Sequence, residues 1–233
     1  MLYGRRTGHR LRPHARGLLD TLLPHLAVPL AEGEPLDPFA LFSPRPRAVW
    51  LEIGFGGGEH LAAQAAARPE IGFVGCEPFV NGVAKLLIAV EAGNLGNVRI
   101  HGDDARPLIE ALPEASLERA FVLFPDPWPK TRHHKRRFIQ TATLDAIARA
   151  LVDDGELRVA TDIADYASWT LAHAVPHPAF EWLARRPADW RTPPEDWVET
   201  RYERKAKAAG RAPVYLRFRR LPRADEGPPR ETA

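Results

Sequence analysis

Residues 48–58 read AVWLEIGFGGG, and this stretch decides the fold class. The first six are apolar except for Glu52, as in a parallel strand that is buried on both faces. Glycines after such a strand permit a tight turn and let the backbone approach a ligand, with a helix N-terminus behind them. A plain strand-to-helix turn is the alternative. The acid Glu77, at the end of the next strand, favours a cofactor loop because a carboxylate there can accept ribose hydroxyls.

Outward from this loop, strands and helices alternate along the chain. We expect strands at 48–53, 71–76, 98–101, 119–124, 155–161, 179–184 and 214–220. We expect helices at 13–26, 57–67, 79–93, 105–111, 136–151, 163–175 and 200–208. This alternation predicts a doubly wound α/β sheet with helices on both faces.

The length of 233 residues fits one domain with appendages. Residues 1–47 are predicted to be a basic N-terminal extension and lead-in, 48–221 the α/β domain, and 222–233 a disordered tail. No apolar run approaches the roughly 18 residues that a transmembrane helix needs, and the N-terminus lacks an apolar signal core. The single cysteine, Cys76, excludes an internal disulfide and a cysteine zinc cluster, and it suggests a cytoplasmic setting. We expect Cys76 to be a buried strand residue, and no metal site is evident.

The net charge of +2 hides an uneven distribution. Residues 1–19 hold five arginines and no acid, and residues 127–144 hold five more cations, again with no acid. The rest of the chain has 22 basic residues against 30 acids, so an acidic body carries two basic segments. Such segments are either solvated surface or a footprint for the phosphates of a nucleic acid.

The acid beside the glycine loop helps to choose between two cofactors. A dinucleotide brings a pyrophosphate, which is repelled by a carboxylate at Glu52. S-adenosylmethionine brings a sulfonium and an ammonium, which a carboxylate attracts. Asp104 follows the third strand and could contact the same ligand, although it could also simply cap the next helix. We therefore favour S-adenosylmethionine, with an NAD-dependent dehydrogenase as the competing hypothesis.

The segment 124–137, FPDPWPKTRHHKRR, is the most informative part of the chain. Asp126 lies after the fourth strand between two prolines, which restrict its backbone and orient its carboxylate. Ligands of open α/β sheets lie at this carboxyl edge. Trp128 offers an aromatic face that could stack on a base or anchor the core, and a basic run follows from Lys130.

This segment strongly resembles the signature of the tRNA (guanine-N7)-methyltransferases. Three further motifs match that family in the right order: the Glu-x-Gly-x-Gly-x-Gly loop, Ala160-Thr161-Asp162 and Thr200-Arg201-Tyr202-Glu203. The resemblance covers about Arg5 to Arg219. Pro129 departs from it, since many members have His there, and Gly57 replaces a larger residue.

The resemblance implies a Rossmann-like class I methyltransferase fold, with a seven-stranded, mostly parallel sheet whose last strand is antiparallel. It implies tRNA as partner, with no obligate protein partner, and Asp126 as the central catalytic residue. The implied donor contacts are Glu52, Gly54, Gly56, Gly58, Glu77, Asp104 and Asp126. The implied contacts to the substrate guanosine and its phosphates are Lys130, Asp162, Thr200, Arg201, Tyr202 and Glu203. The implied contacts to the tRNA backbone are Arg5, Arg6, Arg132, Lys135, Arg136 and Arg137.

Guanine N7 carries a free lone pair, so its methylation needs no deprotonation and no covalent enzyme adduct. Alignment and electrostatic stabilisation of the developing cation are sufficient, and carboxylates suit both tasks. A small-molecule methyltransferase would need no basic segments, and a non-catalytic tRNA-binding module would be expected to lose the donor acids. Neither alternative fits the residues as well.

Overall fold

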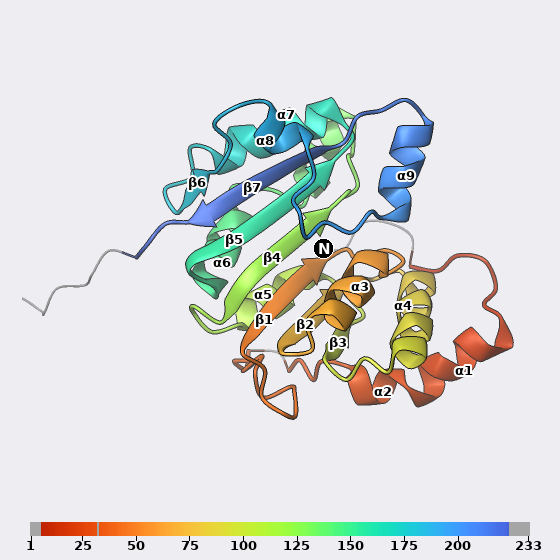
Figure 1. The fold of residues 1–233 in the computed structure, drawn as a ribbon. Coiled ribbons are helices and arrows are strands. Elements are labelled where there is room, and N and C mark those ends of the chain that lie inside the picture. The colour runs from red at the N-terminus through yellow and green to blue at the C-terminus, as the bar shows by residue number, and fades with distance from the viewer. Residues whose placement is uncertain (1–5, 32, 224–233) are drawn as a thin grey trace, which may run out of the picture.

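The computed structural model describes residues 6–31 and 33–223. Strands β1 (Ala48–Ile53), β2 (Ile71–Cys76), β3 (Val98–His101), β4 (Leu117–Leu123), β5 (Leu151–Thr161), β6 (Phe180–Trp182) and β7 (Val214–Arg220) form one sheet. Its order is β3-β2-β1-β4-β5-β7-β6 (Figure 1). The pairs among β1 to β5 are parallel, whereas β7 runs antiparallel to both β5 and β6. The predicted seven-stranded sheet with an antiparallel last strand is confirmed.

Helices cover both faces of this sheet, as the side-chain alternation of β1 shows. Val49, Leu51 and Ile53 join one apolar cluster with α5 (Ala105–Ala111), α6 (Thr141–Ala150) and α7 (Ala164–Ala174). Trp50 joins the other with α3 (Glu59–Ala67) and α4 (Val80–Gly93). A strand that is covered on both faces is apolar at nearly every position, which explains the apolar sequence of β1 before the glycine loop.

Two predicted helices are wrong in part. The expected helix over 136–151 is divided: η1 (Thr131–Arg136) is a 3₁₀ helix, the backbone is extended at Arg137, and α6 starts only at Thr141. The Gln140 side chain caps α6 and also donates to the Arg137 carbonyl at 2.7 Å. The expected helix over 13–26 is divided at Leu22 into α1 (Pro13–Thr21) and α2 (Leu23–Leu26), because Pro24 has no N–H to continue the hydrogen bonding.

The lead-in before β1 is part of the same body. Helix α1 packs on α4, and the Val28 N–H donates to the Ile100 carbonyl at 3.0 Å, beside β3. Leu36 and Phe42 are buried in the main core. The chain is also held at its other end, where Arg223 donates to the carbonyls of Arg149 and Leu151. Residues 222 and 223, the first two of the predicted tail, thus lie against the body of the protein, and the other residues of that tail lie outside the described part.

Two short helices lie on the C-terminal side. Helix α8 (Ala188–Arg191) falls in a Pro/Trp-rich stretch where no helix was expected, and α9 (Arg201–Ala208) matches the expected helix. Figure 1 shows α9 across the carboxyl edge of the sheet from α4, with the glycine loop between them.

Candidate active site

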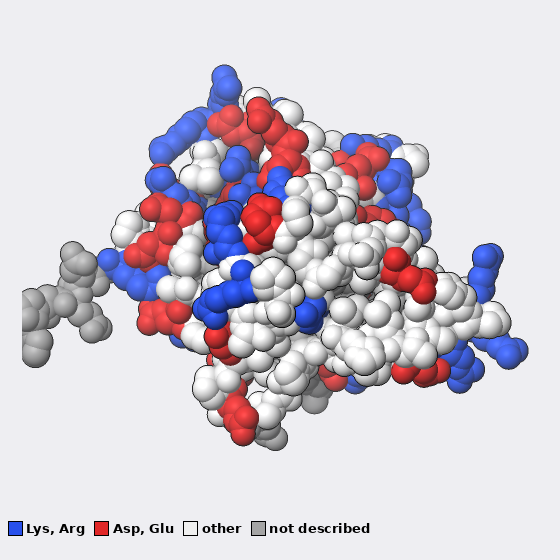
Figure 2. Space-filling model, turned by 60° about the horizontal axis from the view of Figure 1, so that its bottom comes forward, with Lys and Arg blue, Asp and Glu red and all other residues white. Residues whose placement is uncertain are grey.

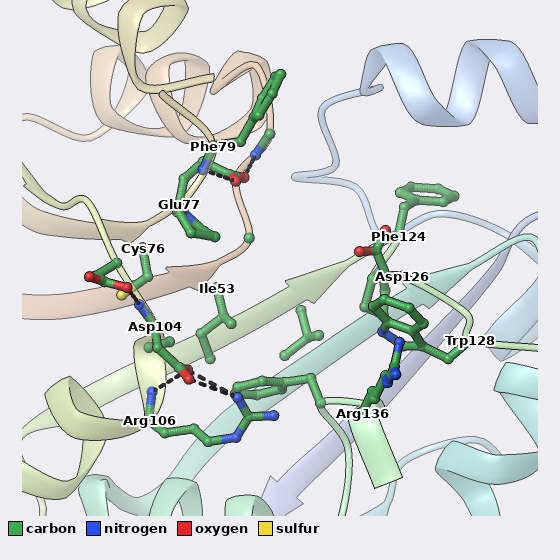
Figure 3. A pocket seen from close by; sticks show the side chains of 18 of the residues that line it. Ile53, Cys76, Glu77, Phe79, Asp104, Arg106, Phe124, Asp126, Trp128 and Arg136 are labelled. Carbon is green, nitrogen blue, oxygen red and sulfur yellow. Dashed lines mark hydrogen bonds and ion pairs between the residues drawn. The ribbon is translucent and has the colours of Figure 1, made fainter. Parts of the chain in front are cut away.

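A cleft of about 400 Å³ opens at the carboxyl ends of β1, β2 and β4. Figure 3 shows its two ends: Glu77 and Asp104 lie on one side, and Asp126, Trp128 and Arg136 on the other. The predicted site residues that line it are Gly54, Gly56, Glu77, Asp104, Asp126, Arg136 and Tyr202. The loop after β1, the loop after β2 and the segment after β4 thus meet at one place, as the motif positions predict.

The glycine loop forms one wall of this cleft. Gly56 has φ +57°, and a Cβ there would lie 2.8 Å from the Tyr202 Cε2 atom. Gly56 is therefore required both by its backbone conformation and by close approach of α9. Gly58 does not line the cleft; it begins α3, where a Cβ would lie 2.8 Å from the Leu86 side chain. Gly58 thus permits close packing between α3 and α4, and its predicted donor contact stays a prediction.

Glu77 is held at the donor end by the loop itself. Its two carboxylate oxygens accept hydrogen bonds from the Gly56 N–H at 2.7 Å and the Phe79 N–H at 2.9 Å. Burial raises the pKa of Glu77 above its ordinary value, and these two hydrogen bonds act against that rise. Each oxygen keeps a further lone pair, so the carboxylate can still accept from a ligand hydroxyl.

Asp104 both caps a helix and lines the cleft. Its Oδ1 accepts from the Arg106 N–H at 3.1 Å, at the start of α5, and from Arg106 Nη1 at 3.0 Å. Arg106 also lines the cleft, and its guanidinium lies 5.4 Å from the centre of the Phe138 ring, close enough for a cation–π contact. The sequence gives no sign of a role for Arg106, since an arginine two residues after a helix cap belongs to no motif.

Glu52 does not face the cleft, although the sequence predicts a donor contact for it. Its side chain is buried, and its Oε2 lies 2.7 Å from His60 Nδ1 on the first turn of α3. The reason is the strand alternation: Glu52 lies on the face covered by α3, between Leu51 and Ile53, which point to the opposite face. Its position beside the loop was predicted correctly, but the direction of its side chain was not.

Asp126 lies at the other end of the cleft, within a segment of unusual backbone. Phe124 and Trp128 on either side have positive φ values of +51° and +42°. The Asp126 side chain is exposed in the cleft, yet the surrounding protein displaces part of its bulk water and raises the pKa of the carboxyl above its ordinary value. A loop that holds non-glycine residues at positive φ is consistent with a site built for function.

Trp128 and Arg136 complete this end. Both line the cleft, and the Arg136 guanidinium lies 4.9 Å from the centre of the Trp128 ring. Of the two roles considered for Trp128, the structure therefore supports an aromatic face of the cleft. Arg136 is expected from the sequence to contact the tRNA backbone, but its place in the cleft brings it to the same pocket as Asp126.

The remaining basic residues divide into exposed and buried ones. Lys130, Arg132 and Lys135 are exposed. Arg137 is only 1% exposed, pairs with Asp165 and donates to the Pro127 carbonyl at 2.9 Å. The guanidinium is an internal support for the 124–137 segment, so its position does not favour the predicted contact with the tRNA backbone.

At the N-terminal segment, Arg6 pairs with Asp103 at 3.0 Å, beside the cleft, whereas Arg5 lies outside the described residues. Figure 2 shows that basic and acidic side chains interleave on the face seen there, so that face carries no continuous basic field. Lys130, Arg132 and Lys135 are among the exposed cations, and they lie close in sequence to the cleft residues Trp128 and Arg136.

The Thr200–Glu203 motif contributes one residue to the cleft, Tyr202. Thr200 caps α9 by accepting from the Glu203 N–H at 3.1 Å, and Arg201 Nε lies 4.0 Å from Glu59. Glu203 is completely buried and accepts from Trp197 Nε1 and Tyr215 OH, both at 2.6 Å. The predicted direct substrate contact of Glu203 is therefore not supported by its position.

Asp162, which follows β5, also has an internal partner. Its Oδ2 accepts from Arg211 Nε at 2.6 Å, and it does not line the cleft. Like Lys130, Thr200 and Arg201, it lies outside the group of residues that the structure brings together around Asp126.

The charges of the cleft suit a cationic ligand. Four acids line it, Glu77, Asp103, Asp104 and Asp126, against two arginines. Burial also raises the pKa of Cys76 at the donor end, which keeps this thiol neutral and poorly nucleophilic. Over residues 6–31 and 33–223 there is no group of three or more His, Cys, Asp or Glu side chains that could hold a metal ion. In the same residues, no helix has the length and apolarity needed to span a bilayer.

Comparison with known proteins places this site in a family. A protein-family model described as "Putative methyltransferase" matches residues 46–216. The tRNA (guanine-N(7)-)-methyltransferase of Rhodospirillum rubrum is 58% identical over 226 residues, which cover 95% of this chain and 88% of that protein. This chain belongs to the tRNA (guanine-N(7)-)-methyltransferase family. The members from Nitrobacter hamburgensis and Bradyrhizobium diazoefficiens are each 52% identical over 218 residues, with 94% of this chain covered and 86% and 92% of theirs.

Solved structures support the fold of this tRNA (guanine-N(7)-)-methyltransferase family member. A variant of the 16S rRNA (adenine(1408)-N(1))-methyltransferase from Catenulisporales acidiphilia, with its cosubstrate S-adenosylmethionine, has a TM-score of 0.56 at 16% identity. The match covers 83% of this chain and 94% of that one. The 16S rRNA methyltransferase KamB has a TM-score of 0.53 at 14% identity, with 76% and 89% covered. Both likenesses confirm the Rossmann-like methyltransferase fold expected from the sequence.

Proposed function

We propose that this protein transfers the methyl group of S-adenosylmethionine to N7 of a guanine in tRNA, giving 7-methylguanosine. The observation that carries the proposal is the cleft itself, which places Asp126 opposite Glu77 and Asp104 in a member of this family. The resemblance of the motifs points to the guanine of the variable loop as the target. The cytoplasm, where tRNA is modified, is the proposed location.

The donor end fits S-adenosylmethionine. Gly54 and Gly56 leave room for the backbone to approach a ligand, and Glu77 and Asp104 offer carboxylates for hydroxyl and amino hydrogens. Four acids in the cleft favour a ligand with a sulfonium and an ammonium, and they oppose a pyrophosphate. When bound, S-adenosylmethionine supplies an electrophilic methyl carbon on a positively charged sulfur.

The target end fits a guanine. The Trp128 ring offers a surface for stacking, and the Asp126 carboxylate can accept hydrogen bonds from guanine N1–H and N2–H. N7 attacks the methyl carbon with its free lone pair, so no general base is required. A carboxylate close to the base also offsets the positive charge that develops on it, which is the electrostatic contribution we assign to Asp126. A base in folded tRNA reaches such a cleft by extrusion from its stack.

The tRNA backbone would be held by the exposed cations of the two basic segments. Lys130, Arg132 and Lys135 lie just after the target end, and Arg6 lies beside the cleft next to Asp103. Tyr202 would contact the substrate or the donor from α9, with Thr200, Arg201 and Glu203 supporting its position. Asp162, which binds Arg211, would contact the substrate after the end of β5. Cations spaced along a groove bind phosphates without reading sequence.

The test is to incubate the protein with unmodified tRNA and S-adenosylmethionine labelled in its methyl group. We expect all the label in 7-methylguanosine after digestion to nucleosides, and strand scission specific for 7-methylguanosine should map it to the variable loop. Label in another nucleoside would refute the proposed reaction. Label in small molecules alone would favour a small-molecule methyltransferase, and tRNA binding without any label would favour a binding module.

A further inference from the structure

A segment far from the glycine loop in sequence packs against it in space. Residues 196–203, which we call the C-terminal wall, run from the loop after α8 into α9. Gln64 on α3 donates to the Asp196 carbonyl at 2.6 Å, at one end of the wall. At the other end Tyr202 lies against Gly56 and lines the cleft. Through Tyr202, the wall therefore lines the cleft beside Gly56.

His60, on α3 just after the glycine loop, lies between strand β1 and this wall. It is only 1% exposed, and its Nδ1 donates to the Glu52 carboxylate at 2.7 Å. Its ring lies 5.6 Å from that of Trp197 in the wall and 4.9 Å from that of Phe121 on β4, centroid to centroid. One side chain thus contacts the strand that leads into the loop, the neighbouring strand, and the wall.

The wall is in turn anchored through Trp197 and Glu203. Trp197 Nε1 donates to Glu203 Oε2 at 2.6 Å, while Tyr215 OH on β7 donates to Glu203 Oε1 at 2.6 Å. The Trp197 and Tyr215 rings are 4.8 Å apart in an edge-to-face arrangement. Glu52, His60, Trp197 and Glu203 hence form a continuous internal row from β1 to α9, and none of the four lines the cleft.

We infer that His60 is a positioning residue for methyl transfer, which fixes the distance between the glycine loop and the C-terminal wall. The inference rests on the proposed function. Moving the wall relative to α3 would separate the His60 and Trp197 rings and break the hydrogen bond from Gln64 to the Asp196 carbonyl, and such losses are costly inside a protein. His60 therefore holds Gly56 and Tyr202 in the one relative position that leaves a cleft of the observed width for the donor.

The inference can be tested with two substitutions of His60 and a matched control. His60→Leu removes the donor to Glu52, whereas His60→Asn keeps an N–H group near the place of Nδ1. His177→Leu is the control, because His177 is also a buried histidine beside a carboxylate, Asp145 at 3.1 Å, but lies next to β6. Affinity for S-adenosylmethionine is measured by calorimetry on the full chain without tRNA, followed by kcat and KM for the donor and by urea unfolding.

We expect His60→Leu to raise Kd and KM for S-adenosylmethionine about tenfold, with kcat reduced less than about threefold, since positioned neighbours typically couple at this level. His60→Asn should restore Kd to within about twofold, and His177→Leu should leave Kd within about twofold of the wild type. Equal Kd values for His60→Leu and His177→Leu would overturn the inference.

Trp197→Phe provides a second, milder variant in case His60→Leu does not fold. It keeps an aromatic ring against His60 and removes the N–H that binds Glu203. A Kd about threefold above that of the wild type supports the inference, and an unchanged Kd contradicts it. A wild-type protein that binds no S-adenosylmethionine would instead refute the proposed function, so the two failures can be told apart.

Discussion

Asp126 and Glu203 are two acids from matched motifs, and the fold places them in opposite environments. Asp126 is exposed in the cleft and accepts no hydrogen bond from the described part of the chain. Glu203 is completely buried and has three partners, Trp197, Tyr215 and Lys207. Each motif contains a carboxylate after a strand or at a helix start, but only one of the two is left available to a ligand.

The pKa directions of the two carboxyls follow from this difference. Partial loss of bulk water raises the pKa of Asp126, and no hydrogen bond or charge from the described residues counteracts this rise. Burial acts the same way on Glu203, but hydrogen bonds from Lys207, Tyr215 and Trp197 outweigh it and lower the pKa. A carboxylate without internal partners is a candidate for chemistry, whereas one with all its partners inside the protein holds the structure together.

The largest effect is expected at Asp126. Asp126→Asn should reduce kcat for tRNA methylation by about 10²–10³-fold, because it removes the charge that offsets the developing cation. The free energy of unfolding and the affinity for S-adenosylmethionine should change little, since the side chain accepts no hydrogen bond from residues 6–31 and 33–223. Asp20→Asn on the exposed side of α1 is the control. Activity of Asp126→Asn within threefold of the wild type would remove Asp126 from the mechanism.

Glu203 should show the reverse behaviour. Glu203→Gln keeps the shape but leaves three donors with a weaker acceptor, so we expect the free energy of unfolding to fall by about 3 kcal/mol. Glu199→Gln is the matched control at the same helix, since Glu199 pairs with Lys207 near the surface and should cost less than about 1 kcal/mol. Urea unfolding followed by circular dichroism measures both. Equal losses of unfolding free energy in the two variants would mean that the buried hydrogen bonds of Glu203 contribute no more to stability than the surface ion pair of Glu199.

The contrast also explains what the sequence could predict. Strands β3 and β7 and helix α5 have the predicted bounds, because local apolar patterns and caps define them. The motif positions also predicted which loops meet at the cleft. They did not predict which side chains face it, since the direction of Glu52 depends on strand alternation and that of Glu203 on aromatic residues from elsewhere in the chain.

The divided helix before α6 has a similar cause. Nothing in the local sequence breaks a helix at Arg137, and the run from Arg136 to Ala150 is a reasonable helix by composition. The break comes from a tertiary contact, in which the Arg137 side chain is drawn inward to Asp165 and the Pro127 carbonyl. Tertiary contacts of a single side chain can override local helix propensity in this way.

A third carboxylate, Asp196 at the start of the wall, sharpens the comparison through its pH dependence. Burial opposes ionisation, but hydrogen bonds and charges of Arg158 and Arg119 lower the pKa of Asp196 to about 2. A depressed pKa stabilises the fold above the unfolded value of about 4, and this stability is lost as pH falls through about 2. Asp196→Asn should lower stability by about 2 kcal/mol at neutral pH and flatten its decline between about pH 4 and 2. If the stability of Asp196→Asn declined with falling pH as steeply as that of the wild type, this role would be contradicted.

The smallest effect concerns the basic run of residues 130–137. In it Arg132 and Lys135 are exposed, whereas Arg137 is buried. Replacing Arg132 and Lys135 together by Ala should weaken tRNA binding about tenfold at low salt. The slope of the logarithm of the binding constant against the logarithm of the salt concentration should become shallower by about 1 to 2, because two phosphate contacts are lost. Replacing Arg185 and Arg186, which are 79% and 78% exposed beside β6, is the matched control and should leave the slope unchanged. Arg137→Ala should instead lower stability, since it leaves a cavity and frees the Pro127 carbonyl. If the control pair flattened the slope as much as Arg132 and Lys135, tRNA would be held by net charge rather than by the surface next to Asp126.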